Sequence, residues 1–219
     1  MISLEEEKIL NYWRKYYKLP FRLTREEVYR FWQIECKPYI TRVEAVKKFK
    51  HRFDLNILIE TGTYHGAMVE AMLNNFDEII SIELDEKLYK AARDKFSKYS
   101  QVDIIHGDSA EVLPKILQSL SKPCIFWLDG HYIPNSTESA RGDVDTPIMD
   151  ELNHILNHHI KDHVILIDDA RCFIGPNPVL NNYPTIQELK DFVIAINPKL
   201  QIDIMDDIIR IHPMKAINK

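Results

Sequence analysis

The sequence predicts an α/β fold with a seven-stranded, mostly parallel sheet, and three observations predict it. From residue 55 onward, short β-branched runs alternate with segments of helical periodicity. The chain has 219 residues, 45% of them hydrophobic, which suits one domain with a substantial core. Only Asp206 and Asp207 separate the last two strand-like runs. Because so short a link cannot hold a crossover helix, these runs should form an antiparallel hairpin.

The elements follow in a regular order. Helices placed between successive strands give right-handed crossovers and a sheet covered on both faces. Asp85, Asp108 and Thr185 stand where helix N-caps are expected. The expected strands are 56–60, 78–82, 101–106, 123–129, 163–168, 201–205 and 208–212, and the expected helices are 67–74, 86–98, 110–120, 146–159 and 185–196.

The first fifty residues form a separate, aromatic-rich region of helical character, followed by the main domain at 51–219. Thr24–Glu27 and Thr41–Glu44 both read as capping boxes, and Ala45, Val46 and Phe49 follow the second at helical spacing. We expect a helical cap that packs on the main domain. A dimerisation arm or a wall of the substrate pocket is the alternative, since exposed aromatic side chains would need a partner.

Composition narrows the class of protein. The 28 basic and 33 acidic residues give a net charge of −5, so the sequence offers no electrostatic footprint for nucleic acid. No segment is long and apolar enough to span a bilayer, and the acidic N-terminus is unlike a signal peptide. Cys36, Cys124 and Cys172 are odd in number and far apart, as in a reducing compartment. We expect a cytoplasmic protein, with a homodimer left open.

Acidic residues close five successive strands. In open α/β sheets, ligands bind beyond the carboxyl ends of the strands, so these side chains should line one edge. Carboxylates in that position indicate a ligand with hydroxyl groups, amines or a metal ion. The five residues are Glu60, Glu83, Asp108, Asp129 and Asp168.

The first three of these strand ends predict S-adenosylmethionine as cofactor. The segment Glu60–Gly66 carries only two glycines and lacks the dinucleotide pattern G-x-G-x-x-G, so a ligand ammonium at Glu60 is favoured over a pyrophosphate. Glu83 can accept both hydroxyls of a ribose, and Asp108 an adenine amine. The expected cofactor contacts are Glu60, Gly62, Thr63, Tyr64, Gly66, Glu83, Asp108, Ser109 and Asp129.

The fourth and fifth strand ends predict a metal site. Asp129, Asp168 and Asp169 should converge, because the two strands are neighbours in this topology. Three unneutralised carboxylates would raise one another's pKa, and a hard divalent cation such as Mg²⁺ would relieve that repulsion. The alternative without a metal is that Asp168 or Asp169 only caps a loop.

These motifs together resemble the macrocin O-methyltransferase-type family of class I methyltransferases, whose members methylate sugar hydroxyls with the help of a divalent metal. The resemblance rests on Glu60–Gly62, Asp129–Gly130 and Ile167–Asp169, and it covers about residues 55–212. It implies a Rossmann-like methyltransferase fold and Asp129, Asp168 and Asp169 as metal ligands. Many relatives have an aspartate base where this chain has His131, and Tyr64 stands where many methyltransferases have glycine.

The predicted chemistry is methylation of a hydroxyl on a sugar or polyol-like molecule. Asp129 with the metal would acidify the hydroxyl, and His131 would take its proton. The residues expected to bind the acceptor are Tyr132, Arg141 and Arg171.

Three rival interpretations stay open. One is a metal-independent methyltransferase with His131 as base, and another is a module that only binds S-adenosylmethionine. A nicotinamide oxidoreductase is disfavoured by the missing third glycine. The histidines of the 146–163 region are expected to lie on a solvated helix face rather than in a site; they are His154, His158, His159 and His163.

Overall fold

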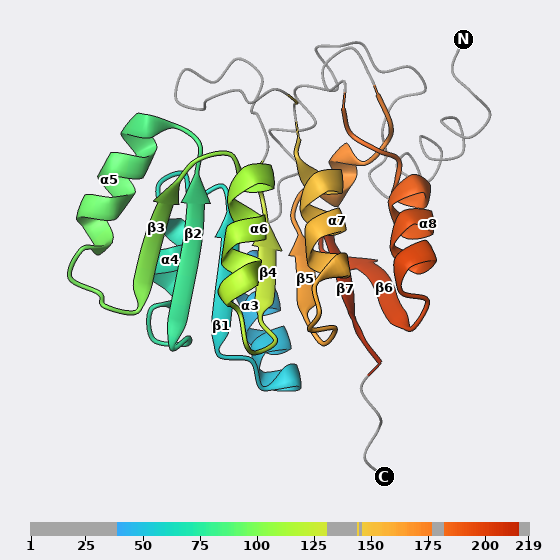
Figure 1. Cartoon of the computed structure of the whole chain (residues 1–219), viewed down its shortest axis with the longest axis horizontal. Helices are drawn as coiled ribbons and strands as arrows, with labels where there is room; N and C mark the ends of the chain where they lie inside the picture. The colour runs from blue at the N-terminus through green and yellow to red at the C-terminus, as the bar shows by residue number, and fades with distance from the viewer. Residues whose placement is uncertain (1–38, 131–143, 145, 177–181, 215–219) are drawn as a thin grey trace.

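The structure is a computed structural model that describes residues 39–130, 144, 146–176 and 182–214. Helices and strands alternate along the described chain (Figure 1). Their order is α3 (Tyr39–Phe53), β1 (Ile57–Thr61), α4 (Ala67–Met72), β2 (Glu78–Glu83), α5 (Glu86–Phe96), β3 (Val102–His106), α6 (Ser109–Ser119), β4 (Ile125–Leu128), α7 (Ile148–Asn157), β5 (Val164–Ile167), the 3₁₀ turn η1 (Ala170–Cys172), α8 (Ile186–Ile196), β6 (Leu200–Met205) and β7 (Ile208–Pro213).

The strands form one sheet in the order β3-β2-β1-β4-β5-β7-β6. The first five are parallel, and β7 pairs antiparallel with both β5 and β6. The turn between β6 and β7 has positive φ at both central residues, 56° at Asp206 and 65° at Asp207, as a tight hairpin turn requires. The predicted seven-stranded sheet with a terminal hairpin is therefore confirmed.

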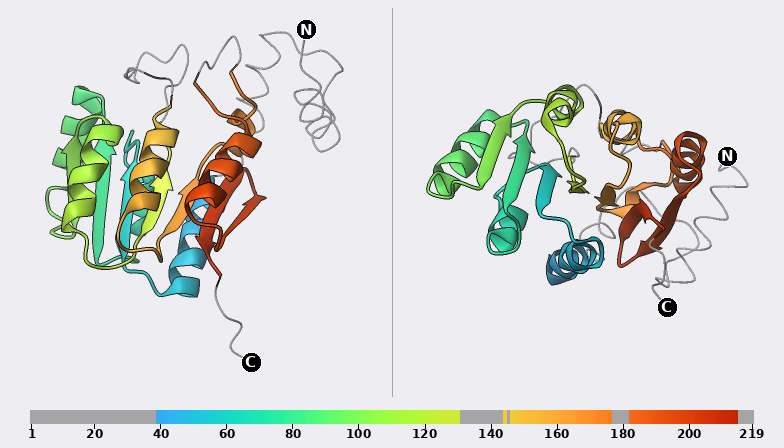
Figure 2. Two further views of the ribbon diagram at one scale, coloured as in Figure 1. Left: turned by 45° about the vertical axis from the view of Figure 1, so that its right-hand side comes forward. Right: turned by 60° about the horizontal axis from the view of Figure 1, so that its bottom comes forward.

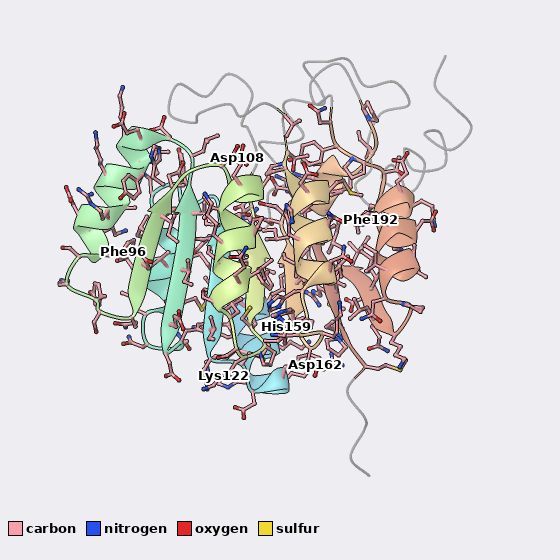
Figure 3. The ribbon with its side chains drawn as sticks, in the orientation of Figure 1. Phe96, Asp108, Lys122, His159, Asp162 and Phe192 are labelled. Carbon is pink, nitrogen blue, oxygen red and sulfur yellow. The ribbon has the colours of Figure 1, made fainter. Side chains whose placement is uncertain are left out.

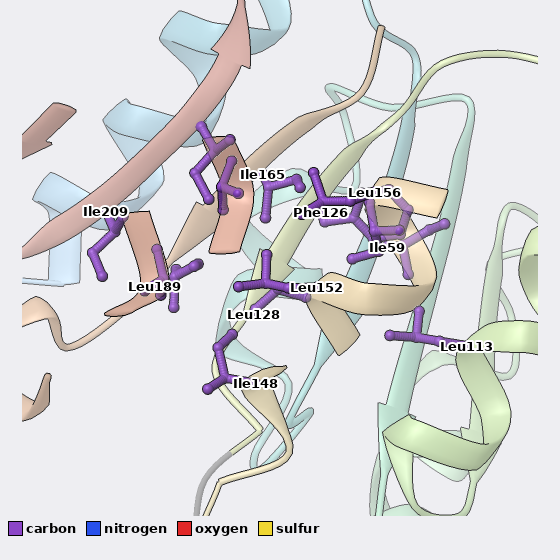
Figure 4. Packing of buried hydrophobic residues seen from close by; sticks show 14 of the residues in the cluster. Ile59, Leu113, Phe126, Leu128, Ile148, Leu152, Leu156, Ile165, Leu189 and Ile209 are labelled. Carbon is purple, nitrogen blue, oxygen red and sulfur yellow. The ribbon is translucent and has the colours of Figure 1, made fainter. Parts of the chain in front are cut away.

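Helices cover both faces of the sheet (Figure 2). Side chains of α6, α7 and α8 pack on one face in a cluster that includes Phe126, Leu152 and Ile165 (Figure 4). On the opposite face, α3, α4 and α5 form a second cluster around Leu58 and Trp127. Because both faces are buried, the central strands are continuous apolar runs up to their carboxyl ends.

Helix α3 belongs to the core of this domain. Val43, Val46 and Phe49 are each at most 4% exposed and pack in the second cluster. The helix already contains Tyr39, so Thr41 is not its cap as the sequence suggested. The expected boundary at residue 50 falls inside this helix, while the helical pieces expected before residue 39 lie outside the described residues.

The expected caps are present. Asp85 accepts hydrogen bonds from Lys87 N and Leu88 N, and Asp108 accepts one from Ala110 N. Thr185 forms a complete capping box with Glu188. None of the described helices has the length and apolar character needed to cross a bilayer.

The expectation for the histidines was wrong for two of the four. Helix α7 ends at Asn157, and the chain turns directly into β5, which brings His158 and His163 together in the interior. His158 Nδ1 lies 2.9 Å from His163 Nε2, and His163 Nδ1 accepts from Cys124 N. These contacts hold the buried rings in place. The edge that bears His159 lies opposite the edge that bears Asp108 (Figure 3).

Candidate functional site

The predicted strand ends meet at one edge of the sheet. Gly62 N donates to Ile82 O, Asp129 N donates to Thr61 O and Asp168 N donates to Leu128 O, at 2.9, 3.0 and 3.0 Å. These bonds extend the parallel pairing one residue beyond the strands. The acidic residues at the carboxyl ends of β1, β2, β4 and β5 are therefore neighbours across the edge at the top of Figure 1.

The loop after β1 passes unusually close to the loop after β4. Gly62 has φ +85°, and a Cβ atom at this residue would lie 2.5 Å from the carbonyl oxygen of Asp129. Gly66, at the start of α4, has φ +72°, and a Cβ there would lie 2.4 Å from the Phe96 ring. Both glycines are thus required by backbone conformation and by space. We refer to the segment 62–66, which these two glycines bound, as the glycine cradle.

Glu60 is a deeply buried acid of this edge, with 2% of its surface exposed. Its carboxyl group accepts a hydrogen bond from the Ser81 hydroxyl, which also lies 2.6 Å from Thr63 Oγ1. Burial raises the pKa of Glu60 to about 8, and the neighbouring Asp129 and Glu83 add to the rise. The raised pKa favours the neutral form of this carboxyl group at pH 7.

Glu83 is held by the backbone of two loops. Its Oε2 accepts from Tyr64 N at 2.7 Å and its Oε1 accepts from Asp85 N at 2.8 Å. Tyr64 has φ +48°, the conformation in which glycine is the commonest residue. Each carboxylate oxygen keeps a lone pair for a further donor, such as a ribose hydroxyl.

Asp108 and Ser109 open α6 at the same edge. The Asp108 side chain caps its own helix through Ala110 N at 2.9 Å. Ser109 is the first residue of the helix and is 7% exposed.

The edge has two halves, the first at the ends of β1, β2 and β3 and the second at the ends of β4 and β5. In the second half, arginine side chains pair with aspartates. Arg42, from the first turn of α3, pairs through Nε with Asp168 Oδ2, and its Nη2 lies 3.2 Å from Asp169 Oδ1. Arg171 Nη1 lies 2.7 Å from the same Asp169 oxygen and also pairs with Asp207 of the β6–β7 turn. The side chains of Arg42 and Arg171 are 12% and 7% exposed.

Repulsion within this group remains despite the arginines. Burial raises the pKa of Asp168 well above its usual value, and Asp129 and Asp169 raise it further, while Arg42 opposes the rise. The second oxygen of Asp168, Oδ1, is buried and has no hydrogen-bond partner among the described residues.

The three aspartates as placed here do not fit a divalent cation. Within the described ranges, no group of three histidine, cysteine or acidic side chains is arranged to hold a metal. Two of the oxygens that would ligate it, Asp168 Oδ2 and Asp169 Oδ1, face guanidinium groups instead. A cation about 2.1 Å from the same oxygens would compete with Arg42 for the same space.

Tyr39 reaches the edge from the same turn of α3. It stands three residues before Arg42, so the two side chains share one face of the helix. Burial raises the pKa of the Tyr39 phenol, with further contributions from Glu60 and Asp129. Helix α3 therefore places a phenol near the first half of the edge and a guanidinium on the second half. No local sequence pattern indicates either placement.

Glu151 was also missed by the sequence analysis. It lies in the first turn of α7, where an acid usually only favours the helix dipole. Yet it is 1% exposed, and its Oε1 is without a hydrogen-bond partner in the described part of the chain. Burial raises its pKa to about 7, opposed by Ser109 and Thr61. Its helical spacing with Ile148, Leu152 and Ile155 is the signal that places it on the buried face.

Three predicted residues lie outside the described chain. They are His131, the expected base, and the acceptor candidates Tyr132 and Arg141. Arg171 is described, and its ion pairs with Asp169 and Asp207 place it inside the protein, at 8% exposure.

Similarity to curated sequences is short. No family model matches the chain. Over 68 residues it is 32% identical to Ribosomal RNA small subunit methyltransferase A of Listeria monocytogenes serotype 4a, a stretch that covers 30% of this chain and 23% of that protein. Over 58 residues it is 36% identical to the protein of the same name from Dehalococcoides mccartyi strain CBDB1, covering 26% and 20%. The matches therefore span less than a quarter of these relatives' length.

Similarity to solved structures extends over almost the whole chain. An SAH-bound methyltransferase from Podospora anserina aligns with a TM-score of 0.55 at 18% identity, covering 98% of this chain and 89% of that one. An O-methyltransferase from Bacillus cereus in complex with SAH aligns with a TM-score of 0.55 at 14% identity, covering 96% and 91%. The sheet order, the terminal hairpin and these neighbours agree, and the chain has the Rossmann-like fold of class I methyltransferases.

Proposed function

We propose that this chain is an S-adenosylmethionine-dependent O-methyltransferase that acts on a hydroxyl group of a sugar or polyol-like molecule. One observation carries the proposal. Buried or half-buried acids lie at the carboxyl ends of three neighbouring parallel strands, beside a cradle whose two glycines have no room for a side chain. Neighbours with the same fold hold SAH, and the O-methyltransferase from Bacillus cereus is one of them.

Each part of the cofactor has a proposed partner. Glu60 receives the ammonium of the methionine end, which would restore its negative charge in spite of burial. Glu83, already oriented by two backbone N–H groups, accepts the ribose hydroxyls. Asp108 and Ser109 face the adenine. The backbone cradle is lined by Gly62, Thr63, Tyr64 and Gly66, with Asp129 beside it.

Bound S-adenosylmethionine supplies an electrophilic methyl group. The acceptor oxygen forms a bond to that carbon as the carbon–sulfur bond breaks, and the hydroxyl proton passes to a base of the protein. Asp129 and His131, two residues apart beyond β4, are the proposed bases. Holding the oxygen in line with the methyl group accounts for most of the rate, since alignment alone contributes about 7 kcal/mol or more in favourable cases.

The metal that the sequence predicted takes no step in this proposal. Asp168 and Asp169 pair with Arg42 and Arg171, which favours the metal-independent alternative. The acceptor is proposed from the resemblance. The net charge of −5 favours a small molecule over RNA, but the names of the curated relatives make RNA the acceptor to test against. The cytoplasmic location and the homodimer remain predictions.

Isothermal titration with S-adenosylmethionine tests the first part of the proposal. We expect micromolar binding by the full chain, with no binding of NADH. Glu83→Ala should weaken it at least about tenfold, through loss of the ribose contacts. No binding of the cofactor under any condition would overturn the proposal.

A transfer assay tests the second part. Radiolabelled methyl groups should appear in a panel of glycosides and polyols, with and without a chelator, and not in ribosomal RNA fragments. Labelled RNA with unlabelled glycosides would keep the methyltransferase and overturn the acceptor. Binding without transfer to any acceptor would favour the non-catalytic module.

A further inference from the structure

We propose that the guanidinium group of Arg42 takes the place of a divalent cation at the Asp168–Asp169 pair, so that this acidic edge binds no metal while α3 is docked. The inference concerns cation occupancy alone. It holds or fails independently of whether the chain transfers methyl groups.

The contacts of Arg42 are those of a bridging counter-ion. Two nitrogens of one guanidinium face oxygens of two successive aspartates, Nε at Asp168 and Nη2 at Asp169. The side chains are 12%, 4% and 10% exposed, so water screens these charges little. A planar guanidinium suits such two-point recognition of carboxylates, as a flexible ammonium does not.

The position of Arg42 is fixed by the core. Val43, the next residue, is 4% exposed, and Val46 and Phe49 follow on the buried face of the same helix. These side chains pack on the sheet through Leu58 and Trp127. Arg42 therefore cannot leave the aspartates without a change of rotamer or undocking of α3.

The positive charges at the site also oppose the binding of a metal ion. Arg171 donates to the Asp169 oxygen that Arg42 also faces. A divalent cation added here would meet two guanidinium groups within a few ångströms, which repel it. The unpartnered Asp168 Oδ1 shows that the carboxylates retain capacity for a cation once Arg42 is gone.

Removal of Arg42 should therefore create a metal site. Mn²⁺ is the probe, because carboxylates bind it and its free and bound forms differ in electron paramagnetic resonance. We expect the wild-type chain to leave Mn²⁺ free up to about 1 mM, and Arg42→Gln to bind it at least about tenfold more tightly. Adding Asp168→Asn to Arg42→Gln should abolish the gain.

Lys48→Gln is the matched control, since it removes one positive charge from an exposed position of the same helix. It should behave as the wild type. Thermal melting of each variant verifies folding. Mn²⁺ binding by Arg42→Gln that is no tighter than that of the wild type would overturn the proposal.

The wild-type chain also tests the proposal without relying on an Arg42 variant that folds. Asp168→Asn in the otherwise unchanged chain should leave Mn²⁺ behaviour as it is. Wild-type binding of Mn²⁺ that Asp168→Asn abolishes would show a working metal site beside Arg42, and would overturn the inference.

Discussion

The two halves of the carboxyl edge satisfy their acidic side chains in different ways. At the carboxyl ends of β1 and β2, Glu60 and Glu83 accept hydrogen bonds from a hydroxyl and from backbone N–H groups, with Ser81 and Tyr64 only 21 and 19 residues away in the chain. Beyond β5, Asp168 pairs with Arg42, 126 residues away. Neutral donors leave the first half ready for a cationic and hydroxylated ligand. In the second half, arginine side chains already serve as counter-ions of the aspartates.

The largest effect is expected from Arg171→Ala, which removes a buried counter-ion from the second half of the edge. It would leave Asp207 buried without its counter-ion and Asp169 paired with Arg42 alone, so the free energy of unfolding should fall by about 3–5 kcal/mol. Urea denaturation measures this. Arg93→Ala, which removes an exposed pair with Asp94, should cost less than about 1 kcal/mol. Equal losses in the two variants would contradict the assigned burial.

Gly62→Ala should disrupt cofactor binding at the first half of the edge. The new methyl group would meet the Asp129 carbonyl, so the loop must move, and affinity for S-adenosylmethionine should fall by more than about a hundredfold. Gly175→Ala is the control, because its φ of +86° imposes the same backbone strain away from the cradle. Calorimetric titration should detect a loss of binding for the first variant alone. A similar loss for both would point to general destabilisation.

Glu60→Gln tests whether the charge of Glu60 contributes to cofactor binding in the first half of the edge. Loss of the ionic contact should weaken S-adenosylmethionine binding by about 10- to 100-fold. In the wild type, a pKa of about 8 means that binding of the ammonium releases a proton from Glu60, so affinity should rise with pH until about pH 8. The variant should lack that rise.

Titrations in buffers of different ionisation enthalpy count the proton released on binding. Glu70→Gln, an exposed carboxyl group paired with Lys95, is the control and should keep the pH dependence. Unchanged pH dependence in Glu60→Gln would remove Glu60 from the ammonium site.

The smallest effect concerns Glu151, which lies between the halves. Its folded pKa of about 7 exceeds the unfolded value near 4.5, so the folded state holds a proton that the unfolded state has lost. Stability is therefore full below about pH 4.5 and falls as the pH rises to about 7. Glu151→Gln should reduce that fall by about 2 kcal/mol in denaturation curves at pH 5 and pH 7. An unchanged fall would mean that Glu151 is ionised when folded.

Much of the fold was predictable because its signals are local. Alternating apolar runs and helical periods placed every described strand and α-helix from β1 onward to within a few residues, while the 3₁₀ turn η1 was not predicted. The caps at Asp85 and Thr185 need only neighbouring backbone groups. The buried contact of His158 with His163 was not predictable, because it depends on how tightly the chain turns between α7 and β5.

The sequence by itself determined the sheet, its hairpin and the row of acids at one edge, because strand ends and chain order fix which residues share that edge. Only the tertiary structure decided what those acids meet. Arg42 reaches Asp168 because α3 docks across the sheet through Val43, Val46 and Phe49, a packing that no local pattern specifies. Charge compensation between distant segments depends on that docking. The sequence therefore predicted a metal where the folded chain places an arginine.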